Sequence, residues 1–109
     1  MTIEEIIKQY RIPVKILKEY ENWNLRGKAK NEYDDSDIEH LSTIMTLYDI
    51  GFTAKETEQY MKLLLAGKST HRERMNMLNK KRMIMLDEIH FKEKQLDRLD
   101  YLRYEMQKS

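Results

Sequence analysis

The first part of the chain carries two short apolar stripes at helical spacing, separated by a turn. Thr2 and Glu5 have the spacing of a capping box, in which Thr2 accepts a hydrogen bond from the third helical amide and Glu5 reaches back. One apolar face then predicts a first helix of about eight residues: Ile3, Ile6, Ile7 and Tyr10. Pro13 suits the first position of a second helix, which runs to about Asn22 and buries Val14, Leu17 and Tyr20. Two short helices joined by a tight turn predict a helix–turn–helix.

The middle of the chain begins with a loop and then returns to the helical pattern. Residues 25–32 contain Gly27 and no apolar rhythm, so we expect a loop that carries three cations: Arg26, Lys28 and Lys30. Asp34 caps the next helix with Asp37 at its third position, and Gly51 ends it. The apolar stripe of this helix is Ile38, Leu41, Ile44, Met45, Leu47 and Tyr48.

A further capping box, Thr53 with Glu56, predicts a helix that ends at Gly67. Its buried side is expected to consist of Met61, Leu64 and Leu65. The sequence therefore predicts a mainly α head over residues 1–67, followed by a second unit over residues 68–109.

The second unit reads as one long helix, because no Gly or Pro interrupts the chain after Thr70. Such a helix is about 58 Å long and needs a partner. A seven-residue repeat predicts a coiled-coil seam for dimerisation: Met75, Leu78, Met85, Ile89, Leu96 and Leu99. Met106 continues the seam, whereas Arg82, Lys92 and Arg103 interrupt it and favour a short antiparallel pairing. Apolar residues off the seam predict a further packing contact: Met83, Ile84, Leu86, Phe91, Tyr101, Leu102 and Tyr104.

The net charge is only +1, so the informative property is how the charges are distributed along the chain. Residues 1–32 carry seven Lys or Arg against five Asp or Glu, residues 33–67 two against seven, and residues 68–109 eleven against seven. The resulting balances of +2, −5 and +4 are compatible with orientation on a polyanion and equally with solvated helix surfaces.

Composition excludes several classes of site. The chain has no cysteine, which removes disulfides and thiolate metal sites. The three histidines, His40, His71 and His90, are far apart, so we expect no metal site and no cofactor. No nucleophile stands beside a base, so we expect no catalytic residues and no enzyme. The acidic N-terminus and the lack of a long apolar run predict a cytoplasmic protein with no membrane contact.

Three segments, in order, resemble the DNA-binding domain of MerR-family transcription regulators. The family's V-R-T-L-R-Y-Y-E helix is matched by Val14–Glu21 and its following G-L by Asn24-Leu25. Tyr33 with Asp37-Ile38 matches the end of the wing, and Ile50–Glu56 matches the L-G-F-S corner. The resemblance implies a winged helix–turn–helix with a long antiparallel dimerisation helix.

The resemblance also implies roles for individual residues. It places Lys15 and Lys18 where two arginines reach DNA, and it puts Arg11 and Tyr20 in the same DNA-binding set, although helical spacing makes Tyr20 a core residue. The loop cations Arg26, Lys28 and Lys30 occupy the wing and contact phosphates. Lysine neutralises phosphate but lacks the bidentate fork that reads guanine, so sequence-independent anchoring is expected.

The sequence departs from the family at three points. Glu19 stands where the family has a phosphate-contacting tyrosine, so an anion there is expected to repel DNA. The loop is short, and we expect no effector domain after the long helix. The preferred hypothesis is a homodimeric transcription regulator on double-stranded promoter DNA, with RNA polymerase as a further partner and no small-molecule effector. The alternative is a MerR-like helical dimer that has lost DNA binding and serves as a protein-interaction or mobile-element accessory factor.

Overall fold

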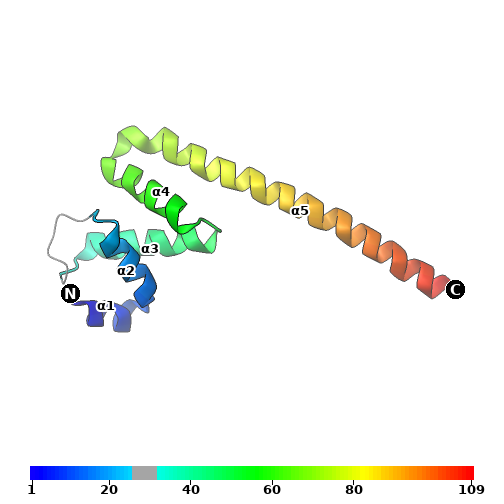
Figure 1. Ribbon diagram of the computed structural model, residues 1–109, viewed down its shortest axis with the longest axis horizontal. Helices are drawn as coiled ribbons and strands as arrows, with labels where there is room; N and C mark the ends of the chain where they lie inside the picture. Colours follow the sequence, from blue (N-terminus) through cyan, green and yellow to red (C-terminus); the bar gives the residue numbers. More distant parts are fainter. Residues whose placement is uncertain (26–31) are drawn as a thin grey trace. The chain divides into compact units, whose positions relative to one another are not determined.

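The computed structural model describes residues 1–25 and 32–109, and within these ranges the only regular elements are helices (Figure 1). The helices are α1 (Ile3–Tyr10), α2 (Val14–Asn22), α3 (Asp35–Asp49), α4 (Ala54–Ala66), the short 3₁₀ helix η1 (Lys68–Thr70) and α5 (His71–Lys108). The mainly α fold predicted from the sequence is therefore confirmed. The described residues contain no strand, so the wing is not shown.

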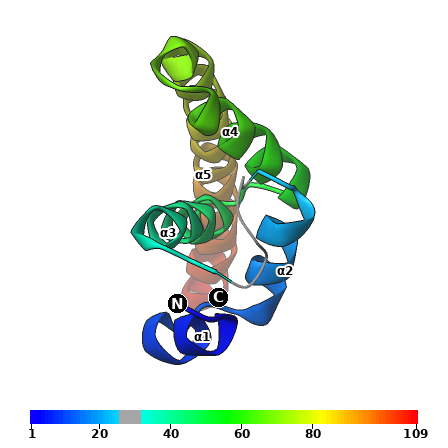
Figure 2. The same ribbon diagram turned by 90° about the vertical axis from the view of Figure 1, so that its left-hand side faces the viewer.

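The chain divides into two compact units, residues 1–74 and residues 75–109. In the first unit α2 and α4 both pack against α3, and α1 lies beside α2 (Figures 1 and 2). The amino terminus is held to this unit, since the Met1 ammonium donates to the carbonyl oxygen of Tyr33 at 2.8 Å. In return the Tyr33 amide donates to the Met1 carbonyl at 3.0 Å. These paired hydrogen bonds fix the start of α1 beside the start of α3.

The helix starts follow the predicted capping chemistry, with two differences. Asp34 and Thr53 each form a complete capping box, with Asp37 and Glu56 respectively, as predicted. The Thr2 hydroxyl accepts a hydrogen bond from the Glu5 amide at 3.2 Å, as predicted. The Glu5 carboxylate, however, accepts from the Thr2 hydroxyl and not from the Thr2 amide, so the second bond of a capping box differs here. Pro13 is the N-cap of α2 rather than its first helical residue, because its ψ of 139° is extended.

The end of α3 is a Schellman motif built on Gly51. The Phe52 amide donates to the Leu47 carbonyl at 2.9 Å and the Gly51 amide donates to the Tyr48 carbonyl at 3.0 Å. Gly51 has a φ of +96°, which glycine adopts without the steric cost that a side chain brings. Leu47 and Phe52, the two positions that commonly form an apolar contact in this motif, are both buried.

The core of the first unit lies where the apolar stripes of its helices meet. Its buried apolar residues are Ile6, Ile12, Leu17, Tyr20, Tyr33, Leu41, Ile44, Leu47, Phe52 and Met61. Two predicted core residues are wrong. Val14 is 48% exposed because it shares a helix face with Lys18, one turn on, rather than with Leu17 and Tyr20. Leu65 is 40% exposed because it lies farther around α4 than the stripe through Thr57 and Met61.

The first turn of α5 belongs to the first unit and is fastened to α4 by polar contacts. The Thr70 hydroxyl lies 2.5 Å from the Leu63 carbonyl oxygen and 2.8 Å from that of Gly67, so its proton is directed at the end of α4. Arg74 donates through Nε to the Thr70 hydroxyl at 3.2 Å, and its guanidinium lies 6.0 Å from the centre of the Tyr60 ring. These contacts place the division between the two compact units after Arg74. The predicted boundary between the DNA-binding head and the dimerisation helix, after Gly67, stays a prediction.

The second unit is the remainder of α5, a single uninterrupted helix. No residue of α5 is buried. Within the described ranges, no helix combines the length and apolar character that crossing a membrane requires.

Candidate nucleic-acid interface

The outer face of α2 carries the two lysines that the sequence singled out. Lys15 and Lys18 are exposed and stand three residues apart, so they project from the same side of the helix. Neither ammonium makes a hydrogen bond or an ion pair with another described residue. Both charges are therefore available to a polyanion.

Arg11 lies at the turn before α2. It is exposed and has a φ of +54°, and its amide closes α1 by donating to the Ile7 carbonyl at 3.0 Å. Its place among the DNA-contacting residues stays a prediction.

Tyr20 faces the opposite way and is part of the core. The side chain is 1% exposed, and its hydroxyl donates to Oδ1 of Asp37 at 2.7 Å and lies 3.1 Å from Nδ1 of His40. Asp37 is itself buried and also completes the capping box of α3. A side chain enclosed in this way does not reach DNA, so the inclusion of Tyr20 in the DNA-binding set is wrong, whereas its expected core position is confirmed.

The two glutamates of α2 are held by tyrosine hydroxyls. The Tyr48 hydroxyl donates to Oε2 of Glu19, and the Tyr33 hydroxyl donates to Oε1 of Glu21. Both carboxylates are half-buried. Burial, followed by the hydrogen bond and the negative charge of Glu19, raises the pKa of the Tyr48 phenol well above its usual range. Tyr48 therefore stays protonated and keeps its proton directed at Glu19.

The hydrogen bond from Tyr48 changes the effect expected of Glu19 on DNA binding. An anion at that position was expected to repel a DNA backbone, but here the carboxylate is bonded to α3 rather than projecting with the lysines. No local pattern predicts the bond, because Glu19 and Tyr48 are 29 residues apart in sequence. The same holds for Tyr20 and Asp37, which only the packing of α2 on α3 brings together.

Asn22 is a candidate interface residue that the sequence reasoning missed. It is exposed and lies one turn after Lys18 on the same face of α2. Its carboxamide can both donate and accept hydrogen bonds, whereas a lysine ammonium can only donate them. The available signal was its spacing of four residues from Lys18.

Three predicted DNA contacts, Arg26, Lys28 and Lys30, lie outside the described residues. Among the residues that are described, no group of three His, Asp or Glu side chains is arranged to hold a metal ion.

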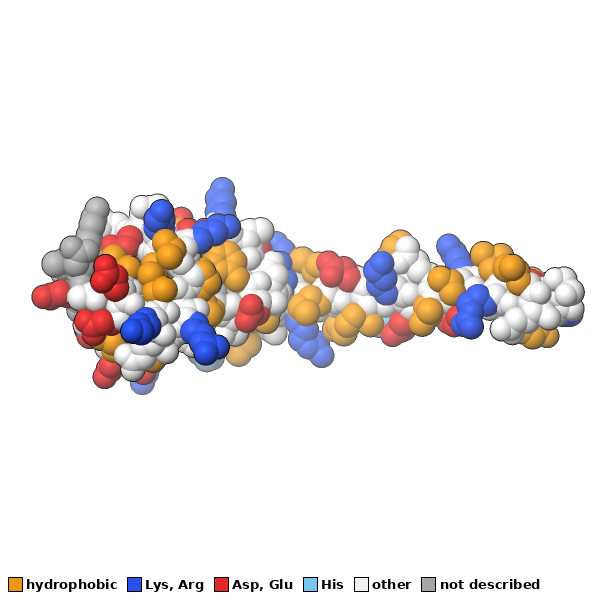
Figure 3. Space-filling view, turned by 90° about the horizontal axis from the view of Figure 1, so that it is seen from below, with side chains coloured by type: hydrophobic (Ala, Val, Ile, Leu, Met, Phe, Trp, Pro, Cys, Tyr) orange, Lys and Arg blue, Asp and Glu red, His pale blue; other side chains and the backbone are white. Residues whose placement is uncertain are grey.

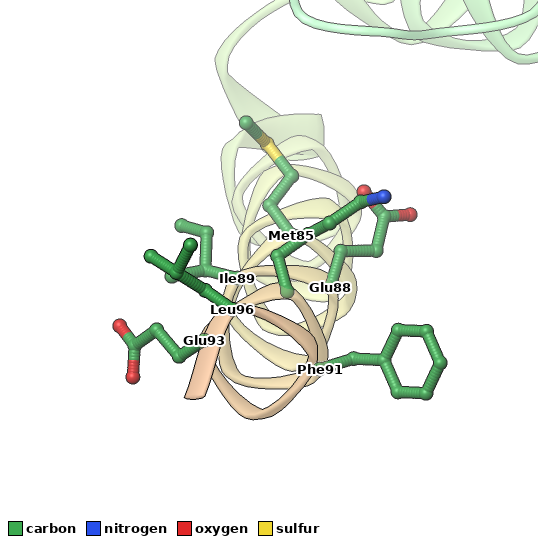
Figure 4. Close-up of a pocket in the computed structure, with 7 residues that line it drawn as sticks. Met85, Glu88, Ile89, Phe91, Glu93 and Leu96 are labelled. Carbon is green, nitrogen blue, oxygen red and sulfur yellow. The ribbon is translucent and has the colours of Figure 1, made fainter. Parts of the chain in front are cut away.

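The six predicted dimerisation residues all lie on α5, where no element of their own unit covers them. Met75, Met85, Ile89, Leu96 and Leu99 are between 43% and 56% exposed, and Leu78 is half-buried. Apolar and charged side chains interleave along this helix in Figure 3. An open, mostly apolar hollow on its middle turns is lined by Met85, Glu88, Ile89, Phe91, Lys92, Glu93 and Leu96 (Figure 4). Ile89 and Leu96 point to the same side in Figure 4, in keeping with one seam.

Comparison with known families identifies the head. The family model described as MerR HTH family regulatory protein matches residues 1–64. The chain belongs to the MerR family. The matched residues include α1, α2, α3 and most of α4, so the helix–turn–helix is that of a DNA-binding transcriptional regulator rather than of an enzyme family. No curated protein and no solved structure matches the chain significantly.

Proposed function

We propose that this MerR-family protein binds double-stranded promoter DNA as a homodimer, with α2 of each copy in a major groove. The observation that carries the proposal is the sorting of charge on α2: Lys15 and Lys18 are exposed and unpaired among the described residues, while Glu19 is bonded to Tyr48. The face offered to a phosphate backbone is thus cationic, which favours DNA over the alternative of a helical dimer without DNA binding.

Lysine chemistry defines what kind of binding to expect. An ammonium neutralises phosphate without selecting a base, so Lys15 and Lys18 supply affinity and a salt dependence. Asn22, on the same face, supplies a carboxamide of the kind that pairs with adenine. Arg11 and the loop cations Arg26, Lys28 and Lys30 are proposed as further phosphate contacts.

The proposed dimer is formed by the long helix of residues 68–109 through the seam of Met75, Leu78, Met85, Ile89, Leu96 and Leu99. These residues lie in pairs at equal distances on either side of Asp87: 75 with 99, 78 with 96, and 85 with 89. An antiparallel pairing of two copies therefore brings each apolar residue opposite another, and Arg82 of each copy lies opposite Lys92 of the other in two further layers. RNA polymerase as a further partner and a cytoplasmic location are part of the same proposal.

The test is a fluorescence anisotropy titration. The probe is a pool of labelled duplexes of about 30 base pairs with random central sequence, long enough for two half-sites one helical turn apart. We expect binding that weakens steeply as the salt concentration rises, because bound lysines release counterions. Selection of bound duplexes over repeated rounds then gives the preferred sequence. Absence of salt-sensitive binding would contradict the proposal.

A further inference from the structure

A second apolar line runs along α5, away from the proposed dimer seam. Met77, Ile84 and Phe91 recur every seven residues, which keeps them on one line of the helix. Ile84 is 43% exposed, Phe91 61% exposed and Met77 half-buried. At roughly 100° per residue, this line lies roughly 120° around the helix from the middle of the seam. Phe91 accordingly points away from Ile89 and Leu96 in Figure 4.

Charged residues fill the turns between these three apolar residues in a self-complementary order. Lys80 and Lys81 precede Ile84, and Asp87 and Glu88 follow it. In an antiparallel pair of helices centred on Ile84, Lys80 of one copy faces Asp87 of the other, and Lys81 faces Glu88. A parallel pair would instead place lysine opposite lysine and carboxylate opposite carboxylate.

The apolar residues obey the same symmetry. Met77 and Phe91 are equally distant from Ile84, so an antiparallel pair brings Ile84 opposite Ile84 and Met77 opposite Phe91. Apolar and ionic layers therefore alternate on both helices in matching order. The partner that fits this surface best is a second copy of the surface itself.

We propose that the Ile84 face, comprising Met77, Lys80, Lys81, Ile84, Asp87, Glu88 and Phe91, joins two seam dimers by an isologous antiparallel contact. This inference rests on the proposed dimer. The face spans about 22 Å with three apolar residues per copy, far less than a stable interface between monomers requires. Joining pre-formed dimers makes the contact effective, and it should strengthen with protein concentration and weaken with salt.

Cysteine cross-linking tests the geometry, since the chain has no cysteine of its own. Ile84→Cys should form a disulfide under mild oxidation, because each Ile84 meets its own equivalent at the two-fold axis. Phe91→Cys is the matched control: it is more exposed than Ile84, but its equivalents are about 21 Å apart in the proposed pair. Phe91→Cys alone should therefore stay uncross-linked, whereas a mixture of Met77→Cys and Phe91→Cys should cross-link.

Sedimentation equilibrium tests the assembly. The unaltered protein should approach the mass of four chains as its concentration rises, and Lys80→Glu should return it to the mass of two. Adding Asp87→Lys to Lys80→Glu restores the opposite charges and should restore the larger mass.

The outcomes separate this inference from the proposed function. A dimer whose mass does not grow with concentration, without cross-linking at Ile84→Cys, would overturn the Ile84-face contact and leave the seam dimer intact. A monomer at all concentrations would overturn both. Cross-linking of Phe91→Cys alone would overturn the antiparallel register.

Discussion

Two neighbouring residues of α2 have opposite charges and lie in different environments. Lys18 is exposed, while the next residue, Glu19, is bonded to Tyr48 on α3. Helical spacing is enough to predict the exposure of Lys15 and Lys18, because Leu17 must face the core. The position of the Glu19 carboxylate could not be predicted, since it depends on a tyrosine that only tertiary packing brings near.

Reversing the charge of the two lysines should remove the proposed phosphate contacts. Lys15→Glu with Lys18→Glu is expected to weaken binding to all duplexes by about tenfold or more and to lower the salt slope by about one unit per lost contact. Anisotropy titrations at several salt concentrations measure both quantities. Lys55→Glu with Lys62→Glu on α4 makes the same change in net charge. Equal losses in the two double variants would show that net charge alone controls binding.

Tyr48 should make stability sensitive to alkaline pH. Its pKa is raised in the folded protein, so the folded state holds this proton more tightly than the unfolded state, in which tyrosine ionises near pH 10. The contribution is complete below about pH 10 and is lost as the pH rises further. Urea unfolding from pH 8 to 11 should show a steeper loss for the unaltered protein than for Tyr48→Phe. Equal slopes would contradict the assignment.

Tyr20 should matter for stability and not for DNA contact. Tyr20→Phe removes the hydrogen bond to buried Asp37 and is expected to lower the free energy of unfolding by about 1–3 kcal/mol. Denaturant titration measures this loss. DNA affinity of the folded fraction should stay unchanged, and a selective loss of affinity at normal stability would restore Tyr20 to the interface.

The helices begin and end where local chemistry directs them. The capping boxes of Asp34 and Thr53 and the stop at Gly51 follow from single residues and their spacing, and for that reason the sequence predicts them well. Val14 and Leu65 were misassigned because an apolar residue at a helix end satisfies the periodic pattern without lying on the contact line. The wing has no comparable local signal, and its residues lie outside the described ranges.

Gly51 provides a test at this scale. Gly51→Ala should lower the free energy of unfolding by about 1–2 kcal/mol, since a side chain disfavours positive φ even though no atom lies within 4 Å of the added Cβ. Ser42→Ala, on the exposed side of α3, is the control and should change stability by less than about 0.5 kcal/mol. A neutral Gly51→Ala would show that α3 ends differently in solution.

At the scale of the whole molecule, the main feature is the set of apolar side chains that α5 leaves exposed to solvent in the single chain. The seven-residue pattern predicted the seam residues, but a sequence pattern cannot distinguish a partner helix from empty solvent, so dimerisation stays a proposal. The family match covers residues 1–64 and ends before α5 begins.

Disrupting the seam should separate the two heads of the proposed dimer. Leu96→Glu places a charge at a seam position that is 56% exposed in the single chain, and it is expected to halve the mass measured by light scattering at low concentration. DNA affinity should fall by roughly 100-fold, because two linked heads bind with avidity. Tyr101→Glu, on another face of α5, should change neither quantity. A dimer that survives Leu96→Glu would rule out the proposed seam.

Thr70 and Arg74 bond the first turn of α5 to α4, and all of these contacts lie within the first unit. With 38 residues, α5 is roughly 57 Å long. In the proposed dimer, the length of this helix would limit how far apart on DNA the two heads can bind.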